Sequence, residues 1–76
     1  MTVTFRPIIC IIDHDRDVRG ILRAQLAAGF VLVEASDGQE GIQVIRQSGA
    51  ALAIVDVISA PIAELRRKFP TLPIIA

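Results

Sequence analysis

The sequence predicts an α/β protein built on a parallel sheet, for two reasons. First, continuous apolar runs of strand length end abruptly at Asp13 and at Asp56, which is typical of central strands buried on both faces. Second, segments with helical periodicity alternate with short apolar segments, and this alternation requires crossover helices, parallel strands and right-handed connections. With the first strand in the middle, we expect about four strands in the order 2-1-3-4, together with three helices.

The first strand and first helix are predicted from an apolar run and the stripe that follows it. We expect the strand at residues 8–12 and the helix at residues 16–28, because apolar side chains recur at helical spacing from Val18 to Leu26. Gly29 should end the helix. The apolar stripe of this helix should face the sheet.

The second strand and second helix are separated by a helix-start motif. Residues 31–35 form a short apolar strand pattern, and Ser36 and Gln39 then match a Ser-x-x-Gln capping box. We expect the helix to open at this box, to run to about Gln47, and to be closed by Gly49.

The last third of the chain predicts a strand, a short helix and a second strand. We expect the third strand at residues 51–55, the third helix at residues 61–69 with Pro61 in its first turn, and the fourth strand at residues 72–76. The basic residues 66–68 should form a solvated face, and Glu64 can pair with the lysine four residues later.

The composition excludes several function classes. The chain has 76 residues, so we expect one domain spanning residues 1–76. Eight basic residues balance eight acidic ones, which removes the electrostatic attraction that nucleic-acid binding needs. Apolar runs stay far below the roughly 18 residues of a membrane span. We therefore expect a soluble, cytoplasmic protein that binds neither nucleic acid nor membrane, with the single cysteine, Cys10, in the core.

Carboxylates that follow the strands mark a candidate site. The first and third strands should be neighbours, so Asp13 and Asp56 should converge at the carboxyl edge of the sheet, where ligands bind in open α/β folds. Asp15 lies two residues beyond Asp13. Carboxylates crowded at this edge repel one another, so they favour a hard divalent cation, and one of them is a potential nucleophile.

Four segments of the chain match, in order, the segments of a known family. They are residues 11–19 with the acidic turn, residues 29–41 with the second strand and the start of the second helix, residues 52–57 with the strand that ends before Asp56, and residues 69–76 with the entry to the fourth strand. In this order and spacing they resemble the response-regulator receiver domain of two-component signalling. The resemblance implies a three-layer, flavodoxin-like fold. It covers essentially the whole chain but only about the first two-thirds of a family domain, without the fourth helix, fifth strand and fifth helix.

The resemblance also implies residue roles and partners. Asp56 would be the phosphoryl acceptor of a receiver module, and Asp13, Asp15 and Asp56 would hold Mg²⁺. His14 stands where the family usually has a second acid, so Mg²⁺ binding should be weak, because imidazole suits this ion poorly. The partner would be a sensor histidine kinase or a phosphotransfer protein, and the module would not be an enzyme in its own right.

A complete family member also uses a Ser or Thr hydroxyl after the fourth strand and a Lys after the fifth. The only lysine here, Lys68, belongs to the expected third helix. This sequence supplies neither of these two residues at the family's positions. Two possibilities therefore stay open: a receiver that is phosphorylated, or a degenerate relative that acts as a protein-interaction module. Without the last strand and helices of a family domain, we expect apolar sheet surface and the strand edge at residues 72–76 to be exposed. Such exposed surfaces predict a homo-oligomer.

Two alternatives start from the same residues. An apolar strand followed by Asp13-x-Asp15 resembles the nucleophile motif of haloacid-dehalogenase-like phosphatases, in which Asp13 would be the nucleophile. That motif expects Gly-Thr next, where this chain has Arg16 and Asp17. A dinucleotide-binding half-domain is disfavoured, because no Gly-x-Gly-x-x-Gly joins the first strand to the first helix.

Overall fold

The computed structural model describes residues 5–76, in which four strands alternate with three helices. In chain order these are β1 (Ile8–Ile12), α1 (Arg16–Leu26), β2 (Val31–Ala35), α2 (Gly38–Ser48), β3 (Leu52–Val55), α3 (Ile62–Lys68) and β4 (Ile74–Ile75). The α/β class and the number of elements agree with the prediction.

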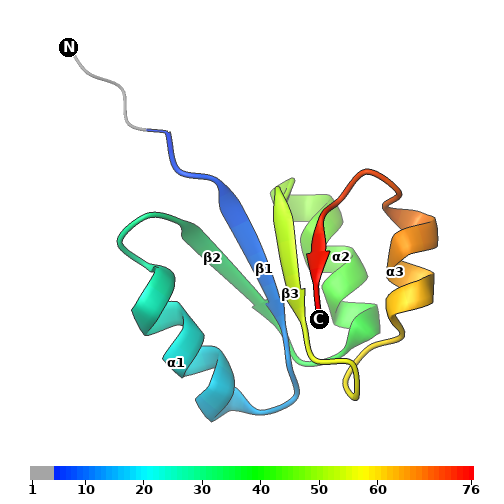
Figure 1. The fold of residues 1–76 in the computed structure, drawn as a ribbon, viewed down its shortest axis with the longest axis horizontal. Helices are drawn as coiled ribbons and strands as arrows, with labels where there is room; N and C mark the ends of the chain where they lie inside the picture. The colour runs from blue at the N-terminus through cyan, green and yellow to red at the C-terminus, as the bar shows by residue number, and fades with distance from the viewer. Residues whose placement is uncertain (1–4) are drawn as a thin grey trace.

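The four strands form one parallel sheet in the order β2-β1-β3-β4, which confirms the predicted flavodoxin-like order. Figure 1 shows three layers, with α1 on one face of the sheet and α2 and α3 on the other. In the central pair, Ile12 of β1 lies opposite Val55 of β3. The next residue of each strand, Asp13 and Asp56, therefore leaves the sheet at the same edge.

The hydrophobic core lies between the sheet and the α2–α3 layer. Its buried members come from the strands β1, β2 and β3 and from both helices, and they include Cys10, Ile12, Ala53 and Leu65. Burial raises the pKa of the Cys10 thiol to about 11, which keeps it protonated at neutral pH. Helix α2 packs close to β1 because Gly41 has no side chain: a Cβ built there would lie 2.4 Å from Cδ1 of Ile12.

Helix α1 packs less deeply than the sequence predicts. None of its residues is buried, and within its apolar stripe Ile21 is 59% exposed, so the expectation that the stripe faces the sheet holds only in part. The helix also ends at Leu26 instead of Ala28. The reason is a tight turn: the backbone N–H groups of Gly29 and Phe30 both donate to the Leu26 carbonyl.

Helix α2 begins one residue later than the predicted capping box. The N-cap is Asp37, whose carboxylate accepts a hydrogen bond from the Glu40 N–H at 2.9 Å, and the Glu40 carboxylate accepts from the Ser36 N–H at 3.3 Å. The predicted pair, Ser36 and Gln39, was therefore wrong, since an aspartate one position on caps the same turn with a charge that also favours the helix dipole. Gly49 closes the helix as predicted, in the left-handed conformation at φ 67°.

The C-terminal elements are shorter than predicted. Helix α3 excludes Pro61 and Phe69, which serve as its N-cap and C-cap, and β3 begins at Leu52 instead of residue 51. Strand β4 contains only Ile74 and Ile75, because the turn before it continues through residue 72 and a proline at 73 supplies no N–H for pairing. The basic residues 66–68 are exposed as expected, but among residues 5–76 no ion pair joins residues 64 and 68.

Candidate functional site

Two carboxylates meet at the carboxyl edge of the central strands. The Asp13 N–H donates to the carbonyl of β2 residue Ala35, and the Asp56 N–H donates to the carbonyl of β1 residue Ile12, so the ladder fixes both backbones up to the acids. The side chains of Asp13 and Asp56 are 15% and 22% exposed. The structure thus brings together the two acids that the sequence predicted would converge.

His14 joins this pair through a serine. The His14 backbone N–H donates to Ser59 Oγ at 3.0 Å, and His14 Nδ1 lies 2.9 Å from the same oxygen. The Ser59 hydroxyl in turn donates to Asp56 Oδ2 at 2.8 Å. A hydroxyl has one proton, so when the Ser59 hydroxyl donates to Asp56, the contact with His14 Nδ1 is a hydrogen bond only in the tautomer that carries a proton on Nδ1.

The imidazole also lies near both carboxylates. His14 Nδ1 is 3.8 Å from Asp13 Oδ1 and 3.5 Å from Asp56 Oδ2. The His14 side chain is 69% exposed. It nevertheless has defined partners, because the loop after β3 places Ser59 directly against it.

The surroundings of Asp56 favour its ionised form. Its pKa is lowered, chiefly by the hydrogen bond from the Ser59 hydroxyl and then by the one from the Ile58 N–H to Oδ1, with a smaller contribution from His14. Hydrogen bonds donated to a carboxylate stabilise its negative charge. At neutral pH Asp56 therefore offers an oxygen nucleophile or a metal ligand.

Asp15 has a different role from the one expected. Its side chain is the N-cap of α1 and accepts hydrogen bonds from the N–H groups of Asp17 and Val18, at 2.9 and 3.4 Å. Its backbone N–H donates to Asp13 Oδ1 at 2.9 Å. The group of possible metal ligands that the structure brings together is Asp13, His14 and Asp56, and Asp15 lies outside it.

An arginine fixes the turn that carries Asp13. Arg19 Nη1 donates to the Asp13 carbonyl at 2.6 Å, and its Nε donates to Glu34 Oε1 on β2 at 3.0 Å. Arg23 also pairs with Glu34. The Arg19 and Glu34 side chains are only 15% and 20% exposed, so this pairing anchors α1 and the Asp13 turn to the sheet.

Ser59 and Arg19 were not predicted as members of this region. A local signal for Ser59 exists: a serine three residues after a strand-ending aspartate can close a turn by hydrogen bonding, as the Ser59 N–H does to the Asp56 carbonyl at 2.9 Å. Arg19 has no comparable signal, because its partners lie on a separate turn and on β2.

The donor set does not fit the expected Mg²⁺. The Asp13, His14 and Asp56 ligand atoms all lie within 4.8 Å of one another. Mg²⁺ demands octahedral geometry with oxygen ligands, whereas one of these three donors is an imidazole nitrogen, and the expected third carboxylate caps a helix. The cluster suits a softer ion better.

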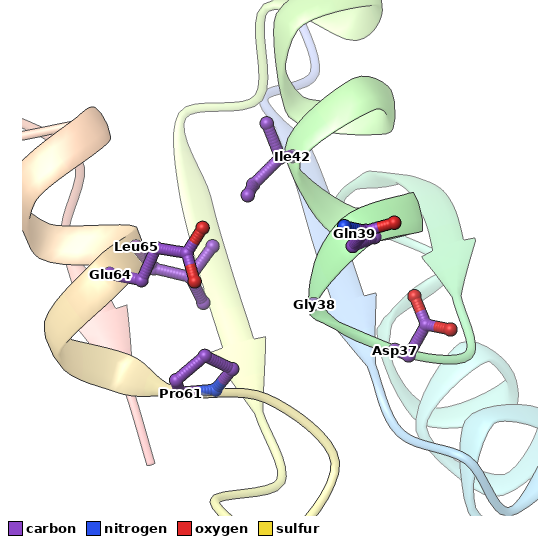
Figure 2. A pocket seen from close by; sticks show the side chains of 7 residues that line it. All are labelled: Asp37, Gly38, Gln39, Ile42, Pro61, Glu64 and Leu65. Carbon is purple, nitrogen blue, oxygen red and sulfur yellow. The ribbon is translucent and has the colours of Figure 1, made fainter.

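A separate groove lies between α2 and α3. It has a volume of about 400 Å³ and includes Asp37, Ile42, Pro61 and Glu64 in its lining, none of which belongs to the acidic cluster. Figure 2 shows the Glu64 side chain pointing from α3 toward α2 across this groove. Its lining combines two carboxylates with apolar side chains such as Ile42 and Leu65, and it is distinct from the site at the sheet edge.

Comparisons with family models, with curated proteins and with solved structures find no match to this chain. Within residues 5–76, no helix has the length and apolar character needed to cross a bilayer.

Proposed function

We propose that the chain is a receiver-type phospho-acceptor module, in which Asp56 takes a phosphoryl group from a sensor histidine kinase or a phosphotransfer protein. The observation that carries this proposal is a partly exposed carboxylate of lowered pKa at the end of a central strand, beside Asp13 and His14. The strand order supports it, since ligands of such sheets bind at this edge. The role is one of cytoplasmic signalling, with no enzyme activity toward a small molecule.

Asp56 acts as the nucleophile. Its carboxylate oxygen attacks the phosphorus of the donor, the bond from phosphorus to the donor's leaving nitrogen breaks, and an acyl phosphate forms on Asp56. The leaving nitrogen keeps the electron pair and takes a proton from water. Hydrogen bonds from Ile58 N–H and the Ser59 hydroxyl hold the two carboxylate oxygens before the donor arrives, which reduces the cost of orientation.

His14 and Ser59 supply hydrogen-bond donors beside the new phosphoryl group. The imidazole nitrogen Nδ1 lies 3.5 Å from Asp56 Oδ2, and the hydroxyl lies 2.8 Å from the same oxygen. Donors placed where negative charge gathers stabilise a phosphoryl transition state. They would partly offset the repulsion between Asp13 and the incoming phosphoryl oxygens.

The surface next to the acceptor favours a protein partner. Val57 and Ile58 directly follow Asp56 and are 60% and 86% exposed. Large apolar side chains beside a reactive carboxylate are typical of a surface that another protein covers. A kinase or phosphotransfer domain would cover this surface while it delivers the phosphoryl group.

Phosphoramidate labelling tests the acceptor. We expect the wild-type chain to gain one phosphoryl group by intact mass, and Asp56→Asn to gain none. Asp37→Asn is the matched control, because it removes a carboxylate that lies outside the Asp13–His14–Asp56 group, keeps a good N-cap for α2, and should be labelled like the wild type. Circular dichroism of each variant confirms that the fold is retained.

The same experiment separates the alternatives. Labelling that persists in Asp56→Asn and disappears in Asp13→Asn would contradict the proposal and favour the phosphatase-like assignment of Asp13 as nucleophile. No labelling of the wild type, with the fold intact, would contradict phospho-acceptance and favour a degenerate interaction module.

A further inference from the structure

We infer that Asp13, His14 and Asp56 bind a borderline divalent transition-metal ion of the Zn²⁺ class in preference to Mg²⁺. The inference shares Asp56 with the proposed function, but binding of the ion needs no phosphoryl donor. It rests on two observations: the mutual distances of the three donor atoms and the presence of an imidazole among them.

The distances suit a tetrahedral ion. Ligands at 2.0–2.2 Å from a tetrahedral Zn²⁺ lie about 3.4 Å from one another, whereas adjacent ligands of an octahedral Mg²⁺ at 2.0–2.1 Å lie only about 2.9 Å apart. His14 Nδ1 is 3.5 Å from Asp56 Oδ2 and 3.8 Å from Asp13 Oδ1. Both separations lie closer to the tetrahedral value, and the Asp13 and Asp56 ligand atoms lie within 4.8 Å of each other.

The donor set points the same way. One imidazole with two carboxylates gives three protein ligands and leaves a fourth position for water, as in open Zn²⁺ sites. Imidazole binds Zn²⁺, Co²⁺ and Ni²⁺ far better than Mg²⁺. The site also has outer partners: the Asp15 N–H donates to Asp13, and the Ser59 hydroxyl donates to Asp56. Such partners orient ligands and strengthen metal binding.

Binding of a divalent ion at this site balances both protons and charge. When Nδ1 takes the ion, a neutral imidazole carries its proton on Nε2, so the ring need not release a proton on binding. The side chain is 69% exposed, so water can accept a hydrogen bond from Nε2. Two carboxylates then neutralise a divalent ion, and the repulsion between Asp13 and Asp56 is removed.

Calorimetric titration of untagged protein with Zn²⁺ and, separately, with Mg²⁺ tests this assignment. We expect Zn²⁺ to bind at least about tenfold more tightly than Mg²⁺. The chain has one histidine, so the imidazole nitrogen resonances report on His14 alone, and Zn²⁺ should shift Nδ1. Cys10 is fully buried and should not compete for the ion.

Two variants make the test specific. His14→Asp should weaken Zn²⁺ binding by at least about tenfold, since outer-shell changes alone cost 10–100-fold, and should tighten Mg²⁺ binding. Asp15→Asn changes the neighbouring residue of the same turn and removes one negative charge but keeps the helix N-cap, so it should leave Zn²⁺ affinity within about twofold of wild type. Circular dichroism checks the fold of both.

Three results would overturn the inference: Mg²⁺ binding as tightly as Zn²⁺ in the wild type, Zn²⁺ affinity unchanged in His14→Asp, or a large loss in Asp15→Asn, which would place Asp15 among the ligands. Failure of phosphoramidate labelling would leave the titrations unaffected. The metal site and the phospho-acceptor can therefore fail independently.

Discussion

Replacement of Gly41 by alanine tests the packing that positions the site. Gly41 lies on the face of α2 that meets β1, and an added Cβ would lie 2.4 Å from Cδ1 and 3.0 Å from Cγ1 of Ile12. Normal carbon–carbon contacts are at about 3.5–4.0 Å, so Ile12 or the helix must move by about 1 Å. Ile12 is fully buried and directly precedes Asp13, so it has little room to move.

Two opposing terms set the magnitude. Alanine in place of glycine within a helix contributes about 1 kcal/mol of stability, whereas overpacking a core costs about 1–3 kcal/mol. Gly41→Ala should therefore lower the free energy of unfolding by up to about 2 kcal/mol. Gly20→Ala on α1 is the matched control, because its Cβ meets no atom within 4 Å. That variant should gain about 1 kcal/mol, so the two variants should differ by about 1–3 kcal/mol, which is the cost of the clash.

Urea unfolding followed by far-ultraviolet circular dichroism measures both variants, since the chain has no Trp or Tyr for fluorescence. Ile12→Val removes the Cδ1 atom that the new Cβ would strike. Alone it should cost about 0.5–1.5 kcal/mol, and in the Gly41→Ala background it should cost less. Equal stabilisation by Gly41→Ala and Gly20→Ala would refute the close packing of α2 on β1.

Three further outcomes are expected. Ser59→Ala should raise the pKa of Asp56, as measured by carboxyl-carbon NMR titration. Because the pKa of Asp56 is lowered in the folded state, its ionised form stabilises the fold at pH values above the ordinary carboxyl range, and this stabilisation is lost as the pH falls through the folded-state pKa. The stabilisation should be smaller in the variant. Glu34→Gln should lower the free energy of unfolding by about 1–2 kcal/mol in low salt and by less in high salt, because Arg19 and Arg23 lose their charged partner. Light scattering after size exclusion at micromolar concentration should show a homo-oligomer, because apolar side chains such as Ile58 and Ile75 are 86% and 53% exposed, and a monomer would contradict this.

The sequence alone predicted the architecture. Apolar runs that end at acids indicated buried parallel strands, and alternation with helical stripes predicted the order β2-β1-β3-β4. These signals are local and repeat along each element, so they can be recognised without any knowledge of tertiary contacts. Element ends were less predictable, as the shift of the α2 cap from Ser36 to Asp37 shows, because neighbouring polar residues compete for the same free N–H groups.

The sequence also predicted that Asp13 and Asp56 would converge, because adjacent parallel strands end at one edge. Only the tertiary structure decided their partners. Ser59 meets His14 across 45 positions of the chain, and Asp15 turns away to cap α1, which leaves an imidazole in place of a third carboxylate. The path of the loop after β3 and the competition of the α1 N-terminus for Asp15 set this arrangement, and neither leaves a periodic signal in the sequence.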